Sequence, residues 1–194
     1  MAFIDLIADE AATGPAATIY AEARAAMGYV PNYARAFASQ PDVYLAWQQL
    51  NRTIRSAGDL RRFELATLAA ARKLRSSYCA LAHGKILAEK FSDNESVRAF
   101  PRGLSPVDVA VVELAEKVVV DATSVTAADV DRLRTLGLSD DEILVVVLAA
   151  AARCFFSKTL DALGIQPDSA YGTLDPELRS ALTVGRPIEG AVSA

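Results

Sequence analysis

The sequence is poor in several residue types whose scarcity narrows its class. Its 194 residues include one histidine, two cysteines and one tryptophan, and the net charge is only −4. Two cysteines are too few for a disulfide framework in a chain of this length. The arginines are scattered without a basic cluster, so the sequence shows no electrostatic footprint for nucleic acid. We therefore expect free thiols and no nucleic-acid partner.

An apolar segment of membrane-spanning length is also missing, and the N-terminus lacks the apolar stretch of a secretory signal. The N-terminal stretch MAFIDLIADEAATG has no positive region and carries acids where a secretory signal is apolar. The apolar run 143–152 has about half the length of a membrane span and is followed by Arg153. We interpret this run as a buried helix and predict a cytoplasmic protein without a membrane partner.

Helix start and stop signals are frequent, whereas few stretches alternate between polar and apolar residues. With 52% hydrophobic residues the chain can bury a substantial core. We predict an all-α, single-domain bundle spanning 1–194, with about seven to nine helices and a core at about 14–165. Residues 166–194 are expected to form a C-terminal arm that lies on the surface or contacts another subunit. The predicted helices cover 15–27, 31 or 32 to 38, 41–56, 60–74, a helix capped by Ser76 or Ser77 that ends at about 91, 93–100, 106–121, 127–136 and 140–163.

Three groups that can handle protons lie on two adjoining predicted helices: Glu64, Cys79 and His83. Cys79 and His83 are four residues apart, which places them on one helix face, and Ser76 precedes Cys79 by three. The first turn of a helix favours a thiolate, whereas a nearby Glu64 carboxylate opposes it, so a relay through water or His83 fits better than direct contact.

Each of these groups also has an ordinary structural interpretation. A free cysteine is often simply buried, a lone histidine is often a satisfied core residue, and Glu64 can be a first-turn acid that interacts with the helix dipole. One histidine, one cysteine and one glutamate fall short of the usual metal ligand set. We predict no metal and no cofactor.

The combined spacing resembles the E-x(11)-C-x-x-C-x-x-x-H core of the alkylhydroperoxidase D-like, carboxymuconolactone decarboxylase superfamily, in its peroxidase-related branch. Glu64, Cys79 and His83 match the core, and Ser76 stands where the family has its first cysteine. Residues 28–32, GYVPN, look like the family's G-x-V-P-N turn, and residues 133–143 are similar to its L-R-x-x-G-x-S-D-E-E-I segment. The resemblance implies an all-helical fold that assembles into homo-oligomers, as dimers, trimers or hexamers.

In the peroxidase members the second cysteine attacks the hydroperoxide and the first resolves the sulfenic acid as a disulfide. Carried over, Cys79 is the attacking thiol, Glu64 and His83 form the proton relay, and Tyr78 and Ser76 belong to the pocket. A serine cannot form a disulfide, and Cys154 lies on a distant predicted helix, so an external thiol must act as reductant. The resemblance thus predicts a single-cysteine, peroxidase-related antioxidant protein.

Two alternatives stay open. In a lyase like the decarboxylase branch, His83 would act as acid or base on a lactone acid, with Arg72, Lys73 and Arg75 as candidate cationic partners. The third interpretation is a helical oligomer that has lost its activity together with the first cysteine.

Overall fold

The computed structural model describes residues 2–191, and all regular secondary structure in that range is helical. This confirms the predicted all-α fold. The structure has ten α-helices in this range, and two of them have only six residues. The other eight agree with the predicted number of about seven to nine helices. The α-helices are α1 (Gly14–Met27), α2 (Asn32–Phe37), α3 (Pro41–Ser56), α4 (Leu60–Lys73), α5 (Ser77–Lys90), α6 (Asn94–Ala99), α7 (Pro106–Asp121), α8 (Ala127–Thr135), α9 (Asp140–Ala162) and α10 (Pro176–Leu182). Short 3₁₀ turns cover Asp9–Ala11, Ala122–Ser124 and Ser169–Thr173.

Several helices begin where a short polar side chain satisfies the free amides of the first turn. The Asp59 carboxylate accepts from the Arg62 backbone N–H at 2.8 Å, which starts α4. Ser139 and Glu142 form a reciprocal capping box that starts α9. Helix α5 follows Ser76, which is its N-cap residue although the Ser76 side chain makes no capping hydrogen bond.

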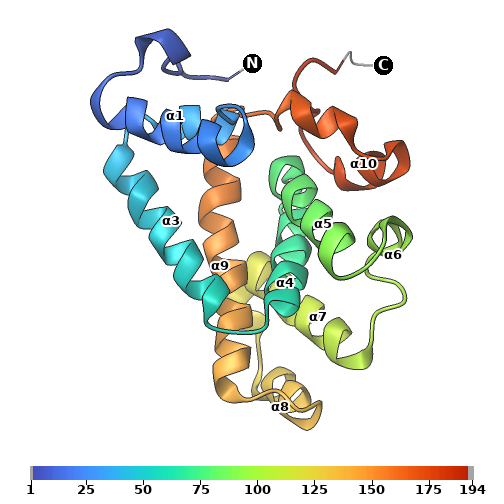
Figure 1. Ribbon diagram of the computed structural model, residues 1–194. Coiled ribbons are helices and arrows are strands. Elements are labelled where there is room, and N and C mark those ends of the chain that lie inside the picture. The colour runs from blue at the N-terminus through green and yellow to red at the C-terminus, as the bar shows by residue number, and fades with distance from the viewer. Residues whose placement is uncertain (1, 192–194) are drawn as a thin grey trace.

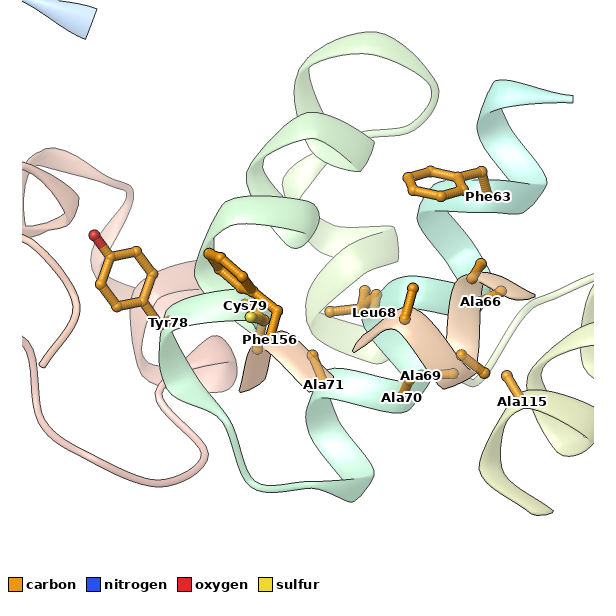
Figure 2. Close-up of a cluster of buried hydrophobic side chains, with 14 of the residues drawn as sticks. Phe63, Ala66, Leu68, Ala69, Ala70, Ala71, Tyr78, Cys79, Ala115 and Phe156 are labelled. Atoms are coloured by element: carbon orange, nitrogen blue, oxygen red, sulfur yellow. The ribbon is translucent and has the colours of Figure 1, made fainter. Parts of the chain in front are cut away.

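Helix α4 lies at the centre of the bundle and contacts α5, α7 and α9 (Figure 1). Every residue from Phe63 to Ala71 is buried, because the helix is covered on all sides. Four of these nine residues are alanines, whose small side chains let the neighbouring helices approach closely (Figure 2). The central position of α4 places Glu64 in the interior of the protein.

Helix α9 is long and apolar enough, by length and composition, to cross a membrane, but half of its most apolar window is buried in the protein. It runs through the middle of the molecule and packs against α3, α4 and α7 (Figure 1). We interpret it as a core helix, as the sequence predicted.

Residues 166–191, predicted as a surface arm or a subunit contact, pack against the rest of the chain, and most of their side chains stay partly or fully exposed. Helix α10 packs on α5 and α6, and its Leu178 and Leu182 are buried (Figure 1). The approach is close, since a Cβ added to Gly185 would lie 1.9 Å from the Arg75 carbonyl oxygen. Prolines cut this segment into pieces too short to show a periodic pattern, which is why its packing on α5 and α6 escaped prediction.

Candidate active site

Glu64 and His83 form a buried pair between α4 and α5. The Glu64 Oε2 atom lies 2.5 Å from His83 Nδ1, and the Glu64 side chain is fully buried. On the other side, Arg55 Nε lies 3.4 Å from Glu64 Oε1, which places a positive charge against the carboxylate. A carboxylate can only accept a hydrogen bond, so this pairing puts the proton on His83 Nδ1. Nε2 is then left with its lone pair, as a base requires.

The surroundings of His83 favour its neutral form. Burial is the main cause that lowers the pKa of His83 below its usual value, and the charge of Arg153 lowers it further. The hydrogen bond to Glu64 and its charge offset part of this shift. A neutral imidazole can take a proton from a nearby acid, so His83 is suited to act as a general base.

Cys79 lies in the first turn of α5 and is only 2% exposed. Arg153 Nη1 donates toward its sulfur at 3.6 Å, so a cation faces the thiol directly. A guanidinium at this place can pair with negative charge that forms on the sulfur during a reaction. The helix N-terminus acts in the same direction.

Arg153 is the residue of this site that the sequence prediction missed. It is 3% exposed, donates from Nη2 to Asn51 Oδ1 at 3.2 Å, and lies over the rings of Trp47 and Phe156. Among residues 2–191 no carboxylate pairs with it. A signal was present, because Arg153 is the single charged residue between Ile143 and Ser157.

A cavity of about 260 Å³ joins these groups. Cys79 and His83 both line it, together with Arg153, which confirms that the i and i+4 positions share one face. Glu64 is not part of its wall and lies behind His83. The wall includes the rings of Tyr33, Tyr44, Trp47, Tyr78, Phe156 and Tyr171.

Tyr78 contributes its ring to this wall but directs its hydroxyl elsewhere (Figure 2). The hydroxyl donates to Asp168 Oδ2 at 2.5 Å, and Asp168 is itself buried. Burial is the main cause that raises the pKa of Tyr78 well above its usual value, and the Asp168 charge adds to it. Tyr78 therefore remains a neutral phenol and offers the cavity an aromatic surface rather than a proton donor.

The remaining predicted residues lie outside the cavity. Ser76 is buried but does not line it. The proposed cationic partners on α4 are wrong, because Arg72 donates to the Ala181 carbonyl and Lys73 pairs with Glu116. Arg75 likewise donates to the Val184 carbonyl.

Cys154, the second cysteine of the chain, follows Arg153 on α9. The helix that carries Cys154 is not distant, since its Arg153 contacts Cys79, but Cys154 is only partly buried and is not part of the cavity wall. Both cysteines are free thiols. Over the described part of the chain, no three His, Cys, Asp or Glu side chains gather so as to hold a metal ion.

Solved structures of alkylhydroperoxidase D-like proteins are similar to this chain. A peroxidase-related protein from Ralstonia eutropha JMP134, described as an alkylhydroperoxidase AhpD core, matches with a TM-score of 0.76 and 21% identity, covering 88% of this chain and 94% of that one. A peroxidase-related protein from Silicibacter sp. TM1040 matches with a TM-score of 0.76 and 17% identity, covering 89% and 94%.

A third similar structure is the debrominase Bmp8, as a cysteine-to-alanine variant in complex with 2,3,4-tribromopyrrole. Its TM-score is 0.70 at 13% identity, and the match covers 94% of this chain and 98% of that one. No family model and no curated protein matches the sequence. At these identities the similarity establishes the fold, so the reaction has to be argued from the side chains.

Proposed function

We propose that this chain, which has the alkylhydroperoxidase D-like fold, reduces hydroperoxides in the cytoplasm through Cys79 as its single reactive thiol. The observation that carries the proposal is that Cys79 and His83 face one cavity, with Glu64 hydrogen-bonded behind His83 at 2.5 Å. Such a nucleophile, base and orienting carboxylate together match the arrangement of an activated thiol. The fold alone does not decide the reaction, since one of the similar structures is a debrominase.

The proposed first step uses these residues as nucleophile and base. His83 Nε2 takes the Cys79 proton, and the thiolate is stabilised by Arg153. The sulfur attacks the terminal oxygen of the hydroperoxide, an S–O bond forms, and the O–O bond breaks. The leaving alkoxide takes the proton from His83, which gives an alcohol and Cys79 sulfenic acid, so the thiol is oxidised by two electrons. Glu64 holds the imidazole in the required tautomer and stabilises it while it carries the proton.

The second step needs a thiol from outside the chain. Ser76 replaces the resolving cysteine of the resemblance, and Cys154 is not part of the cavity wall. One external thiol forms a mixed disulfide with Cys79 and releases water, and a second thiol then frees Cys79 and leaves as the disulfide. Two equivalents of a low-molecular-weight thiol are therefore consumed for each hydroperoxide.

A sulfenic-acid probe tests the proposal directly. After stoichiometric alkyl hydroperoxide, the wild type and Cys154→Ser should be labelled once per chain, and Cys79→Ser should not be. His83→Gln should slow the oxidation by roughly 10²-fold or more, because the thiol loses its base. Labelling that is absent in the wild type, or equal in Cys79→Ser, contradicts the proposal.

A lyase acting on a lactone acid is the second candidate, and Arg153 is the observation that favours it. A buried guanidinium beside a neutral His83 would hold a carboxylate substrate next to a general base. In that case Cys79→Ser should keep the turnover of a lactone acid, and His83→Gln should lose it. If neither change affects turnover, the lyase assignment fails.

A further inference from the structure

About half of the side chains that line the Cys79 cavity are aromatic, and the others include the polar Asn51 and Arg52. The rings of Trp47 and Phe156 stack at 5.0 Å between centroids, and Tyr33 meets Phe156 edge-on at 5.7 Å. Tyr78 meets Tyr33 and Tyr171 edge-on as well, and its hydroxyl is turned toward Asp168. Ring faces and ring edges attract another flat ring in offset or edge-to-face geometry. A planar ring that enters the cavity can therefore contact several of these rings in such geometries.

The cavity also contains a buried positive charge without a full set of partners. Arg153 has the Cys79 sulfur and the Asn51 amide oxygen as acceptors, and its Nε atom has none. Glu64 does not neutralise it, because that carboxylate faces Arg55 and His83. A buried cation is stable when an anion and further acceptors complete its surroundings. A ligand carboxylate in the cavity would supply both.

The size of the cavity limits what can fill it. Its volume of about 260 Å³ lies below the range of roughly 300–1,000 Å³ that holds drug-sized ligands. A single ring with a short substituent fits this space. The aromatic wall residues and the charge of Arg153 together favour a small ligand that has both a flat ring and a negative charge.

We propose that this cavity binds small aromatic acids, with the ring between the aromatic side chains and the carboxylate on Arg153. The substrate class that follows is a single-ring aromatic hydroperoxide that carries an anionic group. The binding stands on the cavity alone, and only the step from ligand to substrate rests on the proposed function.

Fluorescence of Trp47 provides the test, because it is the single tryptophan of the chain and lines the cavity. Titrations use Cys79→Ser at constant protein concentration, so that no thiol chemistry contributes. Benzoate should change the emission saturably and bind about tenfold or more tighter than benzyl alcohol, which lacks the charge. It should also bind tighter than cyclohexanecarboxylate, which keeps the charge but is not flat. Equal affinity for all three compounds overturns the proposal.

A variant of Arg153 separates the charge from the ring walls. Arg153→Gln should lose most of the preference for benzoate over benzyl alcohol, with a small remainder from Arg52, which also lines the cavity. Arg153→Lys should keep more of this preference. If Arg153→Gln does not fold, protection of wild-type Cys79 from iodoacetamide by benzoate, and not by the same concentration of benzyl alcohol, replaces it. Absence of both saturation and protection refutes the binding.

The two proposals fail separately. Benzoate binding to Cys79→Ser without sulfenic-acid formation in the wild type would retain the ligand class and remove the peroxidase reaction. Sulfenic-acid formation without benzoate binding would support the peroxidase reaction and remove the ligand class.

Discussion

The protonation of His83 depends on influences of opposite sign. Burial and the Arg153 charge disfavour the imidazolium, whereas the hydrogen bond to Glu64 favours it. Because burial is the larger influence, the pKa of His83 is lowered and the ring stays neutral at pH 7. The same balance links the base to protein stability, because the exposed ring of the unfolded chain binds a proton more readily.

The free energy of unfolding should therefore decrease as the pH is lowered, over a range that is set by the two pKa values of His83 in the unfolded and folded chain. Below about pH 6.5 the unfolded ring takes up a proton that the folded ring does not, so the free energy of unfolding decreases until the lower folded pKa is reached. Above about pH 6.5 this contribution is complete. Urea unfolding between about pH 7.5 and 5 should show a steeper loss for the wild type than for His83→Gln. Parallel curves for the two proteins would contradict the lowered pKa.

At the scale of elements, the segment after α9 holds the site together. Asp168 accepts hydrogen bonds from the Tyr78 hydroxyl at 2.5 Å, from the Tyr29 hydroxyl at 3.1 Å and from the Asn32 backbone N–H at 2.7 Å. Tyr29 and Asn32 belong to the GYVPN turn, in which Gly28 closes α1 in the left-handed conformation. One carboxylate thus ties this turn, the C-terminal segment and the cavity wall together.

Removal of the Asp168 carboxylate should weaken the contacts between the GYVPN turn, the C-terminal segment and the cavity wall. Asp168→Ala leaves buried donors of Tyr78 and Asn32 without an acceptor, and we expect a loss of about 2–3 kcal/mol in urea unfolding. In the Tyr78→Phe background the hydroxyl is already gone, so Asp168→Ala should cost measurably less. Additive losses in this double-mutant cycle would mean that the Tyr78–Asp168 bond carries no stability of its own.

Helix positions were largely predictable because their signals are local. Helix α3 spans Pro41–Ser56 as predicted, and the caps at Asp59, Ser105 and Ser139 act within four residues of themselves. The same reasoning found Glu64, Cys79 and His83 through their spacing. Arg153 and Asp168 escaped it because they reach the site across 74 and 90 residues of chain, and no local pattern encodes such contacts.

At the scale of the whole molecule, an apolar groove lies between α3 and α9. Its walls are apolar side chains of which Val43, Leu50, Leu148 and Phe155 are between 38% and 51% exposed. Exposed apolar surface of this kind is typical of protein contact sites. Trp47 lines both this groove and the Cys79 cavity, so whatever covers the groove also contacts a wall of the candidate active site.

We expect the groove to be the surface through which copies of this chain form the homo-oligomer that the sequence predicts. A glutamate introduced there would be buried in the contact at a high desolvation cost, so Val43→Glu and Leu148→Glu should lower the mass found by light scattering after gel filtration. Val120→Glu is the matched control, because Val120 is 66% exposed on α7 and does not line the groove. Dissociation should also shift Trp47 emission to longer wavelength, since its groove side becomes wet. A wild type that is monomeric at every concentration, or equal masses for Val43→Glu and the wild type, would place the contact elsewhere or remove it.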